Sequence, residues 1–306
     1  MKLSASSHFV VILQALLVTF LWSTSFIIIK WGLAEIPPIT YAGLRYGLAF
    51  LCFIPFLVQK KYLNEIKSLT KSQWLKLILL GIIFYSFTQG AQFLGLFLLP
   101  SVTVSLMLNF TPILVAILGI RLLNEKPTRL QWIGSSIFIF GILIYFLPLD
   151  LFDNTLVGIF VMIIGVLANA LSAILGRNIN REGNLSPIVV TAISMGIGSL
   201  ILIFSGYLLD GIPQLSSTSV IYLLWLAVIN TAFAFTIWNI TLRTLSAMES
   251  SIINGTMLVQ IAILAWLFND EIVTLKESFG MLIAAMGAIL VQLKNLKIDR
   301  YKIIKT

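Results

Sequence analysis

Ten long apolar stretches follow one another along this chain, and no other feature constrains its fold as strongly. A helix needs about 20 mostly apolar residues to cross the hydrocarbon core of a bilayer. Only 10% of the 306 residues are charged, whereas soluble domains carry about 25%. The sequence therefore predicts an all-α integral membrane protein with ten transmembrane helices, at residues 9–30, 38–58, 74–97, 101–121, 129–147, 155–175, 187–208, 218–239, 249–268 and 275–293.

The joints between these stretches carry helix-start signals. Capping-box sequences, in which two side chains satisfy free backbone N–H groups at a helix start, begin three helices at Thr70-x-x-Gln73, Thr128-x-x-Gln131 and Thr274-x-x-Glu277. Ser186-Pro187 supplies a cap and a first-turn proline to the seventh span. These signals place helix starts where the chain enters the bilayer.

Charge is unevenly distributed among the joints. The net charge is +8, and lysine and arginine collect at both ends of the chain and in every second joint, with Lys30 and Lys276 as exceptions. Cytoplasmic loops carry such an excess, so we interpret it as a topology signal rather than a nucleic-acid surface. The prediction is a multi-pass protein of the cytoplasmic (inner) cell membrane with both termini in the cytoplasm.

Residues for enzyme chemistry are scarce. Cys52 is the one cysteine and His8 the one histidine, which excludes a disulfide framework and histidine or cysteine metal clusters. No phosphate-binding G-x-x-x-x-G-K-[ST] sequence is present. The chain is therefore predicted not to be an enzyme and to need no cofactor or metal.

An internal repeat divides the chain. The run Glu125-x-x-Thr128-x5-Gly134-x6-Gly141 recurs 146 residues later as Glu271-x-x-Thr274-x5-Gly280-x6-Gly287. Because each copy holds an odd number of spans, the copies are expected to be inverted, as in alternating-access carriers with a site near the midplane. The predicted domains are 1–148, 149–296 and a basic cytoplasmic tail at 297–306. The two glutamates are interpreted as structural turn residues, with gate elements as the alternative.

Several motifs resemble one family. Trp22-Ser23-Thr24-Ser25-Phe26, Pro38 with Gly43-Leu44-Arg45-Tyr46, and Asn109-Phe110-Thr111-Pro112 are similar to the EamA repeat of the drug/metabolite transporter superfamily. The resemblance implies a ten-helix carrier, and exporters of amino acids and related metabolites are common in that family. The second copy has Leu258-Val259-Gln260 where a proline like Pro112 is usual, which leaves open whether the ninth span breaks.

Amide side chains within the spans suggest a cavity. They lie on the third, fourth, sixth, eighth and ninth spans, and the predicted substrate contacts among them are Gln89, Gln92, Asn109, Asn169, Asn254 and Gln260. Amides also join helices through hydrogen bonds, which is the alternative. Pro112 frees a backbone carbonyl and is predicted to be a hinge, or else a plain packing kink.

Two tryptophans and one arginine complete the predicted site. Trp22 and Trp238 lie within spans and are expected to contact substrate, although Trp22 facing lipid is an alternative. Arg45 lies inside the second span and is expected to orient a substrate carboxylate. Its alternatives are pairing with Glu35 or with carbonyls, or reaching out to the membrane surface.

The sequence therefore predicts a secondary transporter for a small organic metabolite. An amino-acid-like or other amphipathic solute and export by alternating access are favoured. The alternatives are a channel or lipid-handling membrane protein, or a carrier for nucleosides, vitamins or drugs. The expected partners are a small-molecule substrate and membrane lipids, with no nucleic acid. No span has a carboxylate near its middle, which favours facilitated export or exchange over a carboxylate proton relay.

Overall fold

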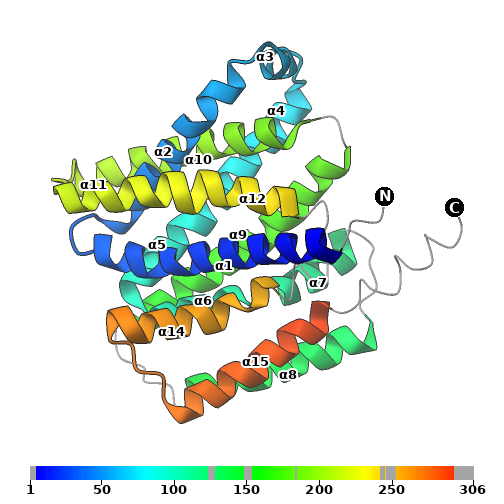
Figure 1. Cartoon of the computed structure of the whole chain (residues 1–306), viewed down its shortest axis with the longest axis vertical. Helices are drawn as coiled ribbons and strands as arrows, with labels where there is room; N and C mark the ends of the chain where they lie inside the picture. The colour runs from blue at the N-terminus through cyan, green and yellow to red at the C-terminus, as the bar shows by residue number, and fades with distance from the viewer. Residues whose placement is uncertain are drawn as a thin grey trace, which may run out of the picture. The chain divides into compact units, whose positions relative to one another are not determined.

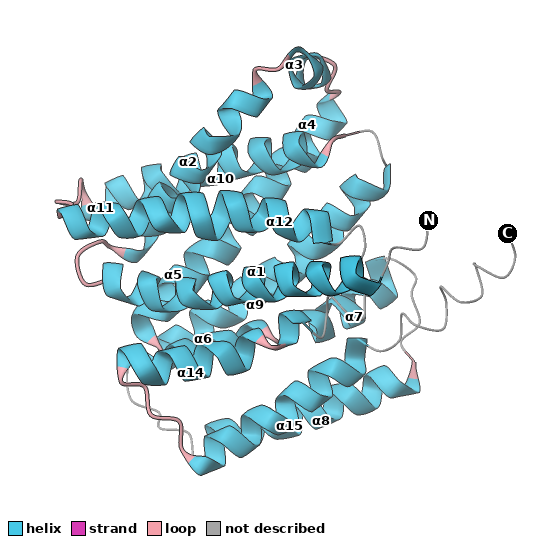
Figure 2. Ribbon diagram, viewed as in Figure 1, coloured by secondary structure: helices cyan, strands magenta, loops and turns pink. Residues whose placement is uncertain are grey.

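A computed structural model of the chain describes residues 5–122, 128–147, 154–182, 185–241, 245 and 253–292. Every regular element in this part of the chain is a helix (Figures 1 and 2). The all-α prediction is therefore confirmed for these residues. Glu125 and the predicted tail at 297–306 lie outside them.

Membrane-length helices cover most of the predicted spans. In the described part of the chain, seven are long and apolar enough to cross a bilayer, namely His8–Gly32, Pro38–Leu57, Lys71–Leu98, Arg129–Phe146, Thr155–Gly176, Pro187–Asp210 and Ser217–Trp238. The predicted spans 101–121 and 249–268 coincide with shorter apolar helices at Ser101–Val115 and Ile253–Asn269. The predicted span 275–293 coincides with α15 (Leu275–Gln292). The count of ten stays a prediction.

All three predicted capping boxes form. Thr70 Oγ1 accepts from the backbone N–H of Gln73 at the start of α4 (Lys71–Leu80), and the same reciprocal bonds begin α8 (Arg129–Phe146). At α15, the Thr274 N–H donates to Glu277 Oε2 over 2.7 Å. Local sequence thus determines these helix starts, because each side chain satisfies an otherwise free N–H group.

The fourth span is interrupted where the sequence places Pro112. Helix α6 (Ser101–Leu108) ends before Asn109, and α7 (Thr111–Leu122) begins one residue before the proline. Between them the Phe110 N–H donates to the Met107 carbonyl over 3.0 Å, which is a tight three-residue turn. Proline has no N–H and disfavours helical backbone in the residue before it.

A turn lies at the matching position of the second copy. Thr256, 146 residues after Phe110, donates its N–H to the Ile253 carbonyl over 3.1 Å just before α14 (Met257–Asn269). No proline is present there. The irregularity therefore recurs in both copies and does not depend on the proline.

The third and eighth spans depart from the regular α-helices that we expected. The third contains a π-helix, η1 (Gly81–Thr88), between α4 and α5 (Gln89–Leu98). The eighth contains η2 (Trp225–Phe233) between α11 (Ser217–Leu224) and α12 (Ala234–Thr241).

Threonine side chains accompany both wide turns. Thr88 donates to the Ile83 carbonyl over 3.1 Å, and Thr231 donates to the Leu226 carbonyl over 2.8 Å. In each case the acceptor is five residues earlier, as π-helical spacing requires. Such segments are rare and frequently lie at functional sites.

The helices form two compact units. Unit 1 comprises Met1–Ile27, Pro100–Phe152 and Ala234–Thr306, and unit 2 comprises Ile28–Leu99 and Asp153–Phe233. Each unit takes helices from both sequence copies. In unit 2, α2 (Pro38–Leu57) packs against α10 (Pro187–Asp210) and against the third span. Helix α9 (Asn154–Glu182) packs against the third span as well.

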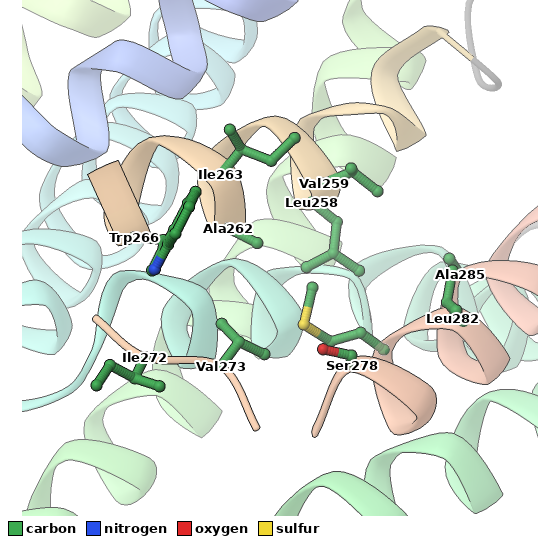
Figure 3. A pocket seen from close by; sticks show the side chains of 11 residues that line it. Leu258, Val259, Ala262, Ile263, Trp266, Ile272, Val273, Ser278, Leu282 and Ala285 are labelled. Carbon is green, nitrogen blue, oxygen red and sulfur yellow. The ribbon is translucent and has the colours of Figure 1, made fainter. Parts of the chain in front are cut away.

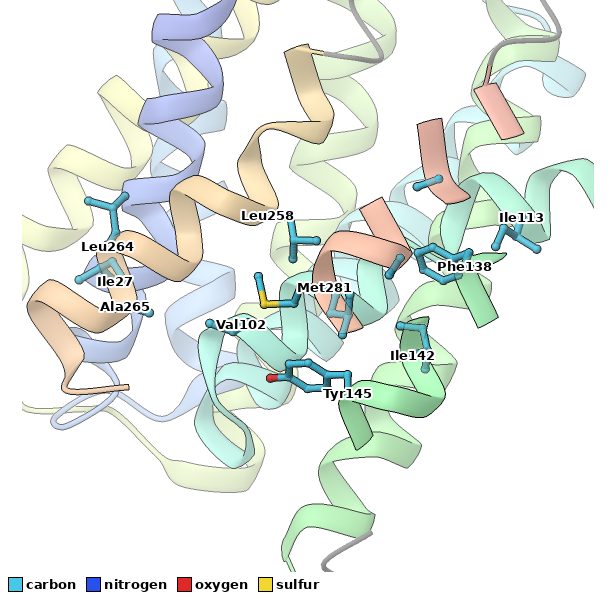
Figure 4. Close-up of a cluster of buried hydrophobic side chains, with 13 residues drawn as sticks. Ile27, Val102, Ile113, Phe138, Ile142, Tyr145, Leu258, Leu264, Ala265 and Met281 are labelled. Atoms are coloured by element: carbon cyan, nitrogen blue, oxygen red, sulfur yellow. The ribbon is translucent and has the colours of Figure 1, made fainter. Parts of the chain in front are cut away.

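Helices α8 and α15 lie side by side in unit 1 at very close range (Figure 1). A Cβ atom on Gly141 would lie 2.4 Å from the Ala284 backbone nitrogen, and one on Gly287 would lie 2.4 Å from the Phe138 nitrogen. The repeated glycines therefore form the contact between these helices. Figure 4 shows the apolar cluster beside the contact, in which Phe138 and Tyr145 are buried with Met281.

Acidic side chains tie loops to helix starts. Glu271 accepts from the backbone N–H groups of Ser101 and Val102 over 2.9 and 3.4 Å at the start of α6. Glu65, on the short helix α3 (Lys60–Lys67) that the sequence analysis did not predict, accepts from the Ser186 N–H over 2.5 Å. Negative charge at a helix N-terminus is stabilising, which supports the structural interpretation of Glu271.

Glu35 makes a similar tie that is expected to depend on pH. Hydrogen bonds from Ser216 and Ser219 lower the pKa of its carboxyl below the ordinary value of 4.5, and the Ser219 hydroxyl donates to Glu35 Oε2 over 2.6 Å. A depressed folded-state pKa stabilises the fold above pH 4.5 and ceases to do so as the pH falls through the folded value. In the wild type, we expect hydrogen-exchange protection at the start of α11 to decrease as the pH is lowered from 4.5 through the folded-state pKa of Glu35. In Glu35→Gln, the protection should be independent of pH.

The start of α8 provides the control for this measurement, because its capping box has no ionisable side chain. Its protection should stay constant over the same pH range. An equal loss of protection at α11 in wild type and Glu35→Gln would contradict the prediction.

Candidate functional site

Three aromatic side chains meet in unit 1. The ring centroid of Trp22 on α1 (Ala5–Gly32) lies 5.3 Å from that of Phe235 and 5.3 Å from that of Trp238, both on α12. Each pair is tilted by 56°, within the range that aromatic pairs prefer. The two predicted tryptophans are thus brought together, and Phe235, which the sequence analysis missed, joins them one helical turn before Trp238.

A polar network begins at the residue next to Trp22. Ser23 donates to Gln260 Oε1 over 2.9 Å, and Gln260 Nε2 donates to Thr256 Oγ1 over 2.9 Å and to Thr19 Oγ1 over 3.4 Å. Both ends of the Gln260 amide are therefore used in joining α14 to α1. Gln260 positions the helix that carries Trp22, as the helix-joining alternative describes.

The indole nitrogen of Trp22 is buried without an acceptor. Among the described residues, none accepts a hydrogen bond from its Nε1. A buried donor without a partner costs about 1–3 kcal/mol. Trp22 thus combines an apolar face that packs on two aromatic rings with a donor that is free to bind an acceptor.

The other predicted residues of unit 1 are more local. The Asn109 side chain donates to the Ser105 carbonyl of its own helix over 2.8 Å, at the break before α7. Asn254 is exposed, and Pro112 is partly buried as the second residue of α7. Asn109 and Pro112 are therefore together at the interruption, whereas neither is linked by a hydrogen bond to the Trp22 cluster in the described part of the chain.

Arg45 lies buried in unit 2, with 4% of its surface exposed. Its Nε donates to Thr231 Oγ1 over 3.0 Å. The guanidinium carbon lies 5.2 Å from the centre of the Tyr46 ring and 5.9 Å from that of Phe93, where cation–π attraction stabilises it. The alternative that it pairs with Glu35 is wrong, because no ion pair joins the two described residues and Arg45 donates to Thr231 while Glu35 accepts from Ser219. Its burial likewise contradicts a side chain that reaches the membrane surface.

Tyr46 connects Arg45 to a predicted amide. Its hydroxyl donates to Gln89 Oε1 over 2.6 Å, and its ring meets Tyr85 edge-on at 5.5 Å. Gln92 lies one turn further along α5 and is partly buried. Asn169 on α9 is also partly buried, and its backbone carbonyl accepts from Ser172 over 2.8 Å.

An apolar groove lies between α14 and α15. Its volume is about 380 Å³, and Figure 3 shows Leu258, Ile263 and Trp266 on one side with Val273 and Leu282 on the other. Among the described residues that line it, only Ser278 and Trp266 carry a polar side-chain atom. Within the described residues, no three His, Cys, Asp or Glu side chains are grouped to hold a metal ion. The residues around Trp22 in unit 1 and those around Arg45 in unit 2 therefore offer aromatic faces and hydrogen-bond donors rather than a set of metal ligands.

Known proteins resemble the chain over nearly its whole length. The sequence model of the EamA-like transporter family matches residues 9–147 and again residues 156–293. The uncharacterised transporter YoaV of Bacillus subtilis is 25% identical over 283 residues, which cover 90% of this chain and 94% of the relative. A "Probable amino-acid metabolite efflux pump" of Escherichia coli K12 is 29% identical over 247 residues, covering 74% of this chain and 75% of the relative.

A solved structure shares the fold. One protein of known crystal structure has a TM-score of 0.66 at 15% identity, covering 96% of this chain and all of that protein. The helical architecture is therefore one that an experimental structure also shows. Since the family model matches both halves of the sequence, the chain belongs to the EamA-like transporter family and is a multi-pass membrane transporter rather than an enzyme.

Proposed function

We propose that this transporter is a secondary carrier that exports an amino-acid-like, amphipathic solute across the cytoplasmic membrane. The observation that carries the proposal is the Trp22 cluster, where a free indole donor lies beside a wall of aromatic rings. The rings suit the apolar part of such a solute, and the donor suits its carboxylate or another acceptor. The name of the Escherichia coli relative, an amino-acid metabolite efflux pump, supports the same solute class.

The proposed substrate contacts come from side chains of each unit. In unit 1, Trp22 and Trp238 provide the aromatic wall, Asn109 and Asn254 provide polar contacts, and Gln260 holds α14 against α1. In unit 2, Arg45, Gln89, Gln92 and Asn169 provide donors and acceptors. A multiply charged phosphate would need more buried cations than Arg45, which disfavours sugar phosphates and nucleotides as substrates.

The proposed mechanism is alternating access between two inverted five-helix repeats, with both termini in the cytoplasm. Two observations support it. The family model matches the chain twice, and both copies have a helix irregularity at the same position, at Phe110 before Pro112 and at Thr256. We propose these two points as hinges, because residues between helices absorb backbone rotation.

Ligand-dependent thermal stability tests the solute class. The purified protein in detergent is heated with single amino acids, nucleosides, amines and vitamins, and the unfolding midpoint Tm is measured. A solute that binds only the folded state raises Tm by mass action, so at least one amino acid is expected to raise it in a saturable manner. A rise with nucleosides, amines or vitamins alone would contradict the amino-acid-like solute and identify the alternative class.

A further inference from the structure

The Arg45 guanidinium has no carboxylate within ion-pair distance among the described residues. Its partners there are the Thr231 hydroxyl and the rings of Tyr46 and Phe93. The side chain is more than nine-tenths buried. A buried charge within a membrane protein is costly, and such residues mark substrate or ion pathways.

Thr231 determines which edge of the guanidinium remains free. It accepts from Nε, and its own hydroxyl proton goes to the Leu226 carbonyl within η2. Thr231 is fully buried, so the guanidinium plane is fixed from the Nε side. No described residue accepts from the two terminal nitrogens, and these are the donors that bind a carboxylate with two parallel hydrogen bonds.

Gln89 offers further donors beside the same tyrosine. The Tyr46 hydroxyl donates to the carbonyl oxygen of Gln89 and thereby fixes the orientation of the amide. The amino group of Gln89 then points away from Tyr46, and no described residue accepts from it. Gln89 is 7% exposed. Arg45 and Gln89 therefore both contact Tyr46, and both keep hydrogen-bond donors for which no described residue is an acceptor. Such donors suit a ligand group that carries acceptors.

We propose that Arg45, held by Thr231 and assisted by Gln89, forms a subsite for a monocarboxylate group. This deepens the proposed function, on which it rests, by specifying how the solute's acidic end is recognised. One carboxylate matches the single positive charge, and its two oxygens match the two terminal nitrogens of the guanidinium. Thr231 acts as a positioning residue that links the subsite to the π-helix η2.

The test uses a probe that carries the carboxylate and little else. Tm of the full-length protein in detergent is measured against propionate and against propionamide, which has the same size and no charge, with chloride keeping the ionic strength constant. Propionate is expected to raise Tm in a saturable manner, and propionamide is not. Equal shifts with the two compounds, or no shift with propionate, would overturn the proposal.

Variants locate the probe. In Arg45→Gln the apparent affinity for propionate is expected to fall by about ten- to hundredfold, the loss that a charge-assisted hydrogen bond implies. Arg45→Lys keeps the charge but not the planar fork and should retain an intermediate affinity. Arg129→Gln is the matched control, because Arg129 is exposed at the start of α8, and it should bind propionate as the wild type does.

Thr231→Val separates positioning from folding. Valine keeps the shape of threonine without its hydroxyl, so the propionate affinity should fall while the propionate-over-propionamide preference persists. An unchanged affinity would contradict the positioning role. The subsite and the proposed function fail by different results. If amino acids raise Tm but propionate does not, the subsite proposal is wrong and the proposed function remains. If neither amino acids nor propionate raise Tm, both fail.

Discussion

Replacing Gly141 with valine is expected to lower Tm by more than any surface change, because it separates α8 from α15. A Cβ atom at Gly141 would lie 2.4 Å from the backbone nitrogen of Ala284 and 2.6 Å from the carbonyl oxygen of Gly280. Both obstacles are backbone atoms, which cannot rotate away as a side chain can. The two helices must therefore move apart, and overpacking of this kind costs about 1–3 kcal/mol or more.

The same substitution elsewhere in a helix provides the control. A Cβ atom at Gly176, inside α9, has a single neighbour, the Leu80 Cδ1 atom at 4.0 Å. Gly176→Val should therefore change Tm little. Both variants share the same change in helix propensity, so the difference between their Tm values reports the close approach at Gly141. Equal losses of Tm in the two variants would show that the close approach at Gly141 does not hold α8 and α15 together.

Replacing Trp22 with phenylalanine is expected to lower transport without lowering stability. The change keeps an aromatic face against Phe235 and Trp238 but removes the buried Nε1 donor, for which no described residue provides an acceptor. Removing an unsatisfied donor recovers part of a penalty of about 1–3 kcal/mol, so Tm without solute should stay constant or rise. Transport should fall about tenfold or more, because the proposed function assigns this donor to the solute.

Trp132→Phe is the matched control for this variant. Trp132 is 52% exposed near the start of α8, where tryptophans form the interfacial belt of membrane proteins. Its replacement should leave the transport rate per folded molecule unchanged. If Trp22→Phe lowers Tm and transport falls only as far as the amount of folded protein falls, Trp22 contributes to packing alone.

Local sequence signals predicted helix starts and overall class well. The capping boxes at Thr70, Thr128 and Thr274 formed because each depends on residues three positions apart. The apolar runs predicted the helices because helix-length hydrophobic segments need little else in a membrane. No local signal in the sequence predicted the π-helices η1 and η2.

The sequence indicated individual candidate residues, but it did not predict the partners that they have in the structure. Arg45 stood out as a cation within a span, yet its partner Thr231 is 186 residues away in the chain. Glu35 was a plausible partner by sequence proximity, but Ser219 binds it instead. Gln260 was predicted to contact solute, and the structure shows its amide bonded to α1 and to Thr256. Such pairings depend on how distant helices pack, which no local pattern encodes.

Counterflow in proteoliposomes tests the carrier claim most directly. Vesicles containing the purified protein are loaded with the solute that raises Tm and are diluted into a trace of the same solute in labelled form. A carrier that exposes its site alternately exchanges solute for solute, so the label is expected to accumulate transiently above its equilibrium level and to saturate with concentration. Uptake that is linear in concentration and independent of the loaded solute would contradict a carrier and indicate a pore.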